Sequence, residues 1–399
     1  MKLKSNIFIV IVCFICWIYP LDIYADDKDD NSLEDSTEED LKNEMLDGIS
    51  LDEMNDIWNE FNEDYGTFFS ETPTKNIADL IKDEGTFSIR SIGTGVVHYL
   101  FYEVTNQAKL LGTLLMLTLF SIILQAISTA FEQSSVSQVA NFIVFIVLVY
   151  VTIASFHDVF TYAHETIEQM SHFMMALLPL MLGLLATFGQ AMSVTFFHPV
   201  IIFLIHVSGL LMTSFIFPLL FLSALLTIIS YLNEKYQATY LAELLKSISI
   251  GTLGVFITIF LGVISVQGTA TAIQDGIALK TTKFITGNFI PVIGGSFTDA
   301  ADTVLASLLL LKNTIGIVGL IIITSIAVFP AVKIMIIAFM YKVAAALLQP
   351  LGKNLIIECL HVVSKYIMYV LACVITATFM FFLAVVFMII ASNIPFLLR

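Results

Sequence analysis

Three residues with metal-binding side chains share one face of an expected helix. His164, Glu168 and His172 are spaced i, i+4 and i+8, and residues at this spacing lie above one another on a helix surface. Imidazole nitrogens and a carboxylate are ligands that zinc accepts. A polar helix joining two membrane spans accounts for the same residues without a metal. We favour this second interpretation, because the sequence shows no partners that would orient the ligands.

Two further histidines and two cysteines lie in apolar surroundings. His198 and His206 are expected to hydrogen-bond to neighbouring helices of a bundle. Cys359 and Cys373 fall in the apolar C-terminal region, where thiols fill core space. The chain contains no GxSxG, P-loop, HExxH or dinucleotide fingerprint. We therefore expect no enzyme, no metal and no cofactor.

The segment 267–313 combines charges, glycines and a proline between apolar helices. Its apolar piece, residues 284–298, is too short to cross about 30 Å of hydrocarbon as a helix. Irregular backbone at membrane depth is tolerated only where protein or a water-filled cavity satisfies its amide groups. We therefore expect a re-entrant or pore-lining element over residues 284–302, at the functional centre of the protein. A solvated connecting loop explains the same residues.

The residues expected to function in this element carry a charge or an amide, or are glycines and a proline with unusual backbone conformations. They are Lys280, Lys283, Gly287, Asn288, Pro291, Gly294, Gly295, Asp299 and Asp302. The two lysines are spaced i, i+3, as are the two aspartates, so each pair shares a helix face. Such charges pair or line a polar path when they lie within a bundle. The aspartates are also expected to open the following helix, where carboxylates favour the positive end of the helix dipole.

Composition places these residues in a membrane. Of the 399 residues, 58% are hydrophobic and 13% charged, and the mean hydropathy is +0.90, whereas soluble domains are about 45–50% apolar and 25% charged. The net charge of −15 comes from one segment, because residues 26–84 hold 21 acidic and 4 basic residues, while residues 85–399 hold 11 and 12. We expect an all-α, polytopic membrane helix bundle that binds no nucleic acid.

The first 25 residues have the order of a secretory signal: two lysines, an apolar run, and Ala25 before the acidic segment. We expect cleavage after Ala25. An uncleaved anchor helix is the alternative, because Ile23 is larger than the residue preferred there. Residues 26–109 would then be an acidic extracytoplasmic segment, disordered over 26–40 and containing amphipathic helices beyond. The first of these helices could dock a partner or fold back on its own membrane domain.

Charge-free runs give the number of membrane spans. A span needs about 20 apolar residues, and residues 110–399 have room for six to eight. The longest uncharged run, 169–233, would make a helix of about 98 Å and must be interrupted. We expect helix breaks at Pro199, Pro218 and Pro330, because a proline ring removes a backbone donor and clashes with the preceding turn.

Two weaker patterns concern orientation and internal symmetry. Seven of the twelve bases after residue 84 fall within residues 280–365, so the positive-inside tendency places much of that region in the cytoplasm. The run SGLLMTSFIFP, residues 208–218, is similar to VGLIIITSIAVFP, residues 318–330. Paired interrupted helices of this kind occur in transporter repeats, although chance similarity between apolar helices explains the match as well.

The sequence KTTKFITGNFIPVIGGSFTDAADTV, residues 280–304, resembles the stage III sporulation protein AE family of endospore-forming bacteria. The signal, the acidic segment and the apolar spans fit the same family. The resemblance implies a multi-pass protein of the mother-cell membrane that surrounds the forespore. It also implies partners: the other membrane subunits of a transenvelope complex, the ATPase of that complex and, indirectly, the forespore stage II sporulation protein Q. The family has no established catalytic residues, so none is carried over.

Two classes of function remain. The first is a non-enzymatic membrane subunit of a sporulation channel or secretion-like complex between mother cell and forespore, required for late forespore development. The second is a self-sufficient secondary transporter, indicated by the proline-broken helices and by polar residues within apolar runs. A transporter would need a site for its coupling ion. A deletion strain that grows normally but stops sporulating after engulfment would favour the first class.

Overall fold

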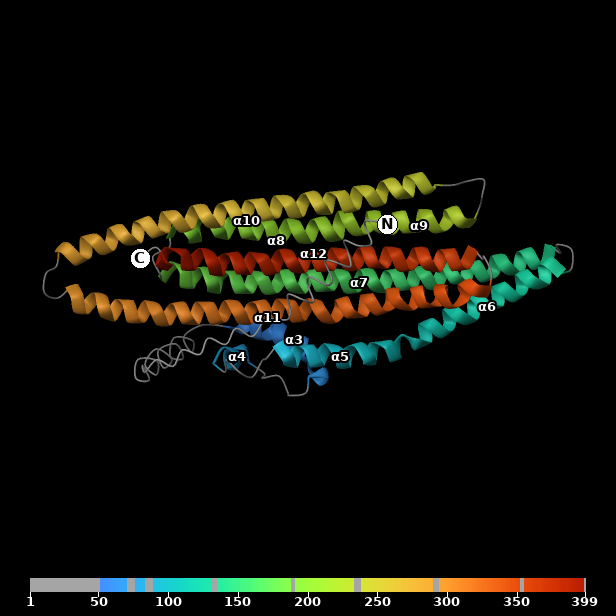
Figure 1. Ribbon diagram of the computed structural model, residues 1–399, viewed down its shortest axis with the longest axis horizontal. Coiled ribbons are helices and arrows are strands. Elements are labelled where there is room, and N and C mark those ends of the chain that lie inside the picture. Colours follow the sequence, from blue (N-terminus) through green and yellow to red (C-terminus); the bar gives the residue numbers. More distant parts are fainter. Residues whose placement is uncertain are drawn as a thin grey trace.

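The protein is described by a computed structural model over residues 51–69, 76–82, 89–130, 135–187, 191–232, 238–289, 294–351 and 355–397 (Figure 1). Every regular element in these ranges is helical, which confirms the all-α class. The expected signal sequence and the leader 26–40 lie outside the described residues.

A short N-terminal group of helices precedes the long bundle. In chain order the elements are α3 (Asp52–Tyr65), the 3₁₀ turn η1 (Gly66–Phe68), α4 (Ile77–Lys82), α5 (Ile89–Asn106), α6 (Ala108–Ala130), α7 (Ser135–Thr187), α8 (Ala191–Leu210), the π-helical turn η2 (Leu211–Ile216), α9 (Phe217–Leu232), α10 (Thr239–Phe289), α11 (Gly294–Leu348), the 3₁₀ turn η3 (Gln349–Leu351) and α12 (Leu355–Leu397).

Six segments within the described residues are long and apolar enough to cross a membrane. They are Ile92–Leu124, Phe142–Thr187, His198–Tyr231, Thr239–Val266, Ser307–Leu348 and Leu355–Ile390. This number agrees with the lower end of the expected six to eight. The helices α7, α10 and α11 have 53, 51 and 55 residues, so each is about 77–83 Å long. Each is therefore more than twice as long as the hydrocarbon core is thick.

The long helices lie side by side in antiparallel order (Figure 1). Central α11 packs most extensively on α12 and also against α7. The hydroxyl of Tyr341 donates to Ser155 Oγ of α7 at 2.7 Å, and Ser364 Oγ of α12 donates to the Ala338 carbonyl at 2.8 Å. Hydrogen bonds between helices fix their register in a membrane, where apolar contact alone discriminates poorly between one register and another.

Two glycines allow α11 to approach its neighbours closely. A Cβ atom on Gly316 would lie 2.6 Å from Cδ1 of Ile389 on α12, and one on Gly319 would lie 2.8 Å from Cδ2 of Leu177 on α7. Small residues at helix contacts serve this purpose in membrane bundles. The α7–α11–α12 packing is therefore the tight centre of the molecule.

Two of the three expected helix breaks are wrong. Pro199 and Pro330 lie inside α8 and α11, and both helices continue on either side. Proline removes one backbone hydrogen bond, but a helix packed among others tolerates that loss. The long uncharged run is instead divided after Thr187, where α7 ends. The two similar runs also differ in structure, since residues 211–216 are π-helical and residues 318–330 are α-helical.

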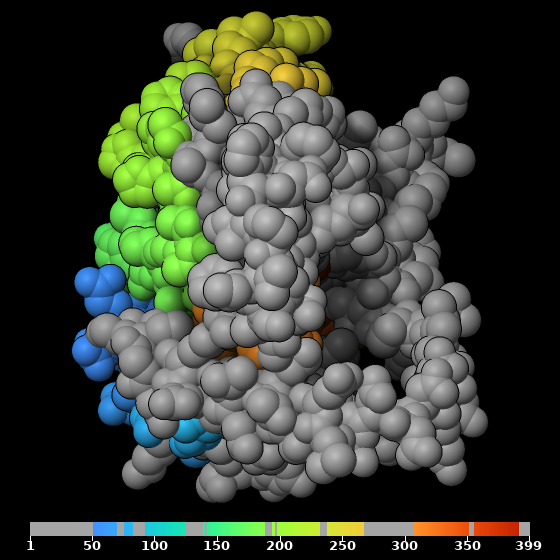
Figure 2. Space-filling view, turned by 90° about the vertical axis from the view of Figure 1, so that its left-hand side faces the viewer, coloured from blue at the N-terminus to red at the C-terminus, as the bar shows by residue number. Residues whose placement is uncertain are grey.

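The acidic segment folds back onto the bundle, as the second of our two alternatives predicted. The side chain of Trp58 is fully buried. Asn55 Oδ1 accepts a hydrogen bond from the backbone N–H of Ile77 at 2.8 Å, which joins α3 to α4. We call α3, η1 and α4 the N-terminal cap. In Figure 2 the blue atoms of the cap and the green atoms of α7–α9 lie along the same side of the molecule.

The cap is attached through a cluster of aromatic rings around Phe329 of α11. The ring centre of Phe329 lies 4.6 Å from that of Tyr65, 5.6 Å from Phe61, 5.7 Å from Phe69 and 5.2 Å from Tyr99 of α5. Stacked and edge-to-face pairs at these distances add to the free energy of apolar burial. The cap is therefore part of the fold of the membrane domain.

Burial within the cluster also affects ionisation. It raises the pKa of Tyr65 above its ordinary value, and the nearby Asp64 carboxylate acts in the same direction. A tyrosine whose pKa is higher in the folded state adds stability below its unfolded pKa of about 10, and this contribution is lost as the pH rises further. The stability of the docked cap therefore does not depend on the ionisation of Tyr65 near neutral pH.

Candidate functional site at a π-helical turn

The expected re-entrant segment forms the far end of the α10–α11 hairpin. Lys280, Lys283, Gly287 and Asn288 lie in the last turns of α10, and Gly294, Gly295, Asp299 and Asp302 lie in the first turns of α11. Pro291 lies outside the described residues, as do the side chains of the whole segment. The backbone is helical up to Phe289 and again from Gly294, so the described part of the expected re-entrant segment is helical.

We expected Asp299 and Asp302 to begin α11, but the helix begins earlier. The helix begins five residues before Asp299, at Gly294, because nothing in the run Gly-Gly-Ser-Phe-Thr prevents helix formation once the chain has turned. Figure 1 shows α10 and α11 continuing past the ends of α7, α8 and α12 at this end of the bundle. Lys283 lies six residues before the end of α10 and Asp299 five residues after the start of α11. The two charged pairs are thus at similar heights on the hairpin.

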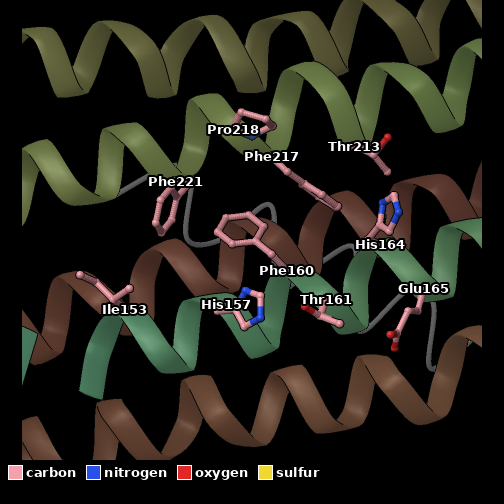
Figure 3. Close-up of a pocket in the computed structure, with 10 residues that line it drawn as sticks. All are labelled: Ile153, His157, Phe160, Thr161, His164, Glu165, Thr213, Phe217, Pro218 and Phe221. Atoms are coloured by element: carbon pink, nitrogen blue, oxygen red, sulfur yellow. The ribbon is translucent and has the colours of Figure 1, made fainter. Parts of the chain in front are cut away.

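A groove with described side chains lies between α7 and the segment formed by η2 and α9 (Figure 3). Its volume is about 590 Å³. The residues that line it are Ile153, His157, Phe160, Thr161, His164 and Glu165 of α7, Thr213 of η2, and Phe217, Pro218 and Phe221 of α9. One wall therefore carries most of the polar groups, and the opposite wall is mainly apolar.

Three phenyl rings form the apolar part of the groove. The ring centre of Phe160 lies 5.6 Å from that of Phe217 and 5.6 Å from that of Phe221. Phe160 and Phe217 project from their helices toward each other in Figure 3. Phe156, buried beneath them, contacts Phe221 edge to face. These contacts hold α7 and α9 at a fixed separation.

The π-helical turn has its cause in Pro218. The ring of a proline clashes with the carbonyl four residues earlier and supplies no backbone donor. Here the backbone N–H of Phe217 donates to the carbonyl of Met212, five residues before it, so the helix is widened by one residue just ahead of the proline. The hydroxyl of Thr213 donates to the Gly209 carbonyl at 2.9 Å. We expected a helix break at Pro218, but the structure has a widened turn within a continuous helical run, His198–Tyr231. Such turns frequently mark functional sites.

The groove is lined mainly by apolar atoms, and most of its polar residues belong to α7. His164 Nε2 lies 3.6 Å from Glu168 Oε2, and both side chains are about half exposed. The Glu165 side chain points away from Phe217 and Pro218 of the opposite wall (Figure 3). Lys333 of α11 places its Nζ 3.9 Å from the centre of the Tyr162 ring.

His164, Glu168 and His172 all lie on α7. Among the described residues no three His, Cys, Asp or Glu side chains come together closely enough to hold an ion. His172 is exposed one turn beyond Glu168. The favoured interpretation, a polar helix that joins two spans, is wrong in its placement, because these residues lie within the single candidate span Phe142–Thr187.

The other singled-out residues lie elsewhere. His198 and His206, expected to hydrogen-bond to neighbouring helices, are exposed on α8. Cys359 and Cys373 are free and buried, as expected of core thiols.

Sequence reasoning missed the groove itself and the cluster around Phe329. The sequence marked Pro218 and His164, but these residues are 54 positions apart, and only the antiparallel packing of α7 on α9 brings their surroundings together.

The comparisons with known proteins agree with the architecture. The sequence profile of the family described as "Stage III sporulation protein AE (spore_III_AE)" matches residues 72–392. The protein named Stage III sporulation protein AE of Bacillus subtilis strain 168 is 48% identical over 363 residues, which is 91% of each chain. No solved structure matches this chain. With most of its length matched by the profile and by this relative, the chain belongs to the stage III sporulation protein AE family.

Proposed function

We propose that the protein is a non-enzymatic membrane subunit of a channel or secretion-like complex that connects mother cell and forespore and is required for late forespore development. The observation that carries this proposal is the 48% identity to a stage III sporulation protein over 91% of both chains. The six candidate spans support a role within the membrane. The name of the family is not that of an enzyme.

The location and the partners belong to the same proposal. The protein would reside in the mother-cell membrane that surrounds the forespore. Its partners would be the other membrane subunits and the ATPase of the complex, with the forespore stage II sporulation protein Q as an indirect partner. The projecting end of the α10–α11 hairpin supports such contacts, because two helices that extend past their neighbours leave faces free for another protein.

A second candidate is a self-sufficient secondary transporter. The observation in its favour is the π-helical turn beside a groove with polar residues, since interrupted helices near polar groups are typical of transporter sites. Purified protein in liposomes would then accumulate a solute when an ion gradient is imposed. The subunit proposal expects no such accumulation.

Deletion of the gene tests the proposed function. Cells without the protein should grow normally and engulf the forespore, and then fail to complete its development. Re-expression of the intact chain should restore the yield of heat-resistant spores. An undiminished spore yield in the deletion strain would refute the proposal.

A further inference from the structure

We propose that the side of the bundle covered by the N-terminal cap borders water at membrane depth, while the side formed by α10 faces lipid. This inference rests on the proposed function and deepens it, because it assigns the side of the subunit that lines the channel. It is carried by the heights at which charged residues occur along the long helices.

A charge-free run of α11 gives the height of the hydrocarbon core. The run 313–332 lies between Lys312 and Lys333, and as a helix it is about 30 Å long, which is the thickness of that core. On α10 and α12 the corresponding uncharged runs begin after Lys246 and Lys365. The three runs lie in the candidate spans Ser307–Leu348, Thr239–Val266 and Leu355–Ile390.

Hydrogen bonds between the helices show that these runs share one height. The helix α12 bonds to α11 directly and to α10 through α9, by the contacts Ser364–Ala338, Tyr366–Ser223 and Ser223–Ala242. Ala338 of α11 and Ala242 of α10 therefore lie at similar heights. Lys333 lies five residues before Ala338, and Lys246 lies four residues after Ala242. Because α10 and α11 are antiparallel (Figure 1), both lysines mark the same surface of the core.

The acidic cap lies beside this charge-free region. The rings of Phe61 and Tyr65 contact that of Phe329, which belongs to the run 313–332 of α11. In Figure 1 α3 lies alongside α11, and it contacts both α11 and α7. The carboxylate of Glu60 accepts a hydrogen bond from Gln169 Nε2 of α7 at 3.4 Å. The cap is therefore at the depth of the hydrocarbon core.

The surface on the cap side is strongly acidic at this depth. The helix α3 contains no lysine or arginine and exposes six carboxylates, those of Asp52, Glu53, Asp56, Glu60, Glu63 and Asp64. On α7, Glu168 and His172 are exposed close to Gln169. Charged side chains are costly in hydrocarbon, and at membrane depth they face protein or a water-filled cavity. These carboxylates are exposed, so water and not lipid solvates them.

The opposite side of the bundle is apolar at the same height. The cap and α10 lie on opposite sides in Figures 1 and 2. The helix α10 exposes Val255, Ile259 and Val263, and it has no charged residue between Lys246 and Asp275. Lipid can cover this surface without cost. The bundle thus has a lipid side and a water side, and carboxylates along an aqueous path favour cations over anions.

Cysteine labelling in permeabilised sporulating cells tests the inference with the full chain. In a variant whose four native cysteines are replaced by alanine, a new cysteine replaces Asn59 of α3 or His172 of α7, which are both exposed. The control is Val255→Cys on α10. A thiol reacts as the thiolate, which forms in water. A charged methanethiosulfonate reagent should therefore modify the two probes at least about tenfold faster than the control. Labelling in denaturant measures the total cysteine.

The control matches the probes in height. Thr378 of α12 donates to Sδ of Met170 of α7 at 3.6 Å, two residues before the probe at position 172. Thr378 lies twelve residues after Tyr366, and Val255 lies thirteen residues after Ala242. Because α10 and α12 run in the same direction (Figure 1), positions 172 and 255 lie at nearly the same depth.

The sign of the reagent's charge makes the test specific for the carboxylates. A cationic methanethiosulfonate should modify His172→Cys faster than an anionic one, because the nearby carboxylates concentrate cations. Glu168→Gln, one turn away, should bring the two rates closer together. The matched control is Glu243→Gln, which removes an exposed carboxylate from α10 and should leave the ratio of the rates unchanged.

Two results would overturn the inference. Reaction at position 255 as fast as at the probes would mean that the bundle at this height lies outside the membrane. Slow reaction at either probe would mean that lipid or another protein covers that part of the cap side.

The two proposals fail separately. If the deletion strain sporulates normally and the probes still react faster than the control, the proposed function is refuted and the water side stands. If the deletion strain arrests after engulfment and the probes react no faster than the control, only the assignment of the water side is refuted.

Discussion

Phe329 links two parts of the chain that the sequence keeps far apart. Its ring contacts Phe61, Tyr65 and Phe69 of the N-terminal region, and it also contacts Tyr99 of α5. Because Phe329 precedes Pro330, the cap sits beside the point where α11 lacks one backbone hydrogen bond. The aromatic cluster therefore holds an acidic, water-facing helix against an apolar helix at a defined height.

Phe329→Ala should release the cap. Replacing a buried phenylalanine by alanine costs about 3–5 kcal/mol, and Phe329 contacts the rings of Phe61 and Tyr65 in the cap. Trp58 is a convenient reporter because the chain has two tryptophans, and the other, Trp17, can be replaced by Phe. We expect the emission of Trp58 to shift to longer wavelength in the purified variant.

The control for this prediction is Phe339→Ala, because Phe339 lies on the same helix and is 56% exposed. Its Trp58 emission should equal that of the parent protein. A Phe329→Ala variant whose Trp58 emission does not move would show that the cap is held by other contacts.

At the scale of the elements, the position of each helix follows from charge-free runs, but the breaks do not. The sequence predicted six to eight spans within residues 110–399, and these residues hold α7 to α12 and most of α6. It placed breaks at Pro199 and Pro330, which are inside helices, because the local cost of proline is known from sequence while the packing that offsets it is not. The groove depends on the register of α7 against α9, a long-range property, and no local pattern around Phe160 or Phe217 reports it.

Close packing at the glycines of α11 leads to a second prediction. In Gly316→Leu the new side chain must displace Ile389, whereas Gly262 of α10 has no atom within 4 Å of its Cβ position. Overpacking costs about 1–3 kcal/mol. The thermal midpoint of Gly316→Leu in detergent should fall by several degrees, while Gly262→Leu should match the parent. Equal midpoints for both variants would contradict the close approach of α11 and α12.

The end of the α10–α11 hairpin yields a third prediction. Replacing Gly294 and Gly295 by Val, or Asp299 and Asp302 by Asn, should leave the protein level in the membrane fraction unchanged and abolish forespore maintenance. The first pair stiffens and enlarges the start of α11, and the second removes two charges from the projecting tip. Spore yield, measured beside membrane protein level, checks both variants. If both double variants gave the parental spore yield, the end of the hairpin would be an ordinary connecting segment.

At the scale of the whole molecule, the lysines that suggested an orientation are spread along the bundle. Lys280 and Lys283 lie in the last turns of α10, whereas Lys342 lies near the C-terminal end of α11 and Lys365 lies in α12. Lys342 and Lys365 fall within the candidate spans Ser307–Leu348 and Leu355–Ile390. The number of bases alone therefore does not decide the orientation.

A fourth prediction concerns topology and assumes that the signal is removed after Ala25. The mature chain then begins near Asp26, and N-terminal sequencing of membrane-extracted protein should recover that residue rather than Met1. A cysteine in place of Ser36 should react with an impermeant maleimide once the outer surface is opened. Four candidate spans precede Thr281 and three precede Ala238, so a cysteine in place of Thr281 should react from the same side as Ser36→Cys, whereas one in place of Ala238 should react only after lysis. Labelling of the cysteine at position 238 from outside would contradict this arrangement.

In our proposal the protein works as a subunit of a larger membrane assembly. Mild detergent extraction of sporulating cells, followed by affinity purification of the tagged full-length chain, addresses this claim directly. We predict co-purification of the other membrane subunits and the ATPase in one species of defined size, absent from vegetative cells. Recovery of the chain alone, together with ion-driven solute uptake by that protein in liposomes, would contradict the account and favour a self-sufficient transporter.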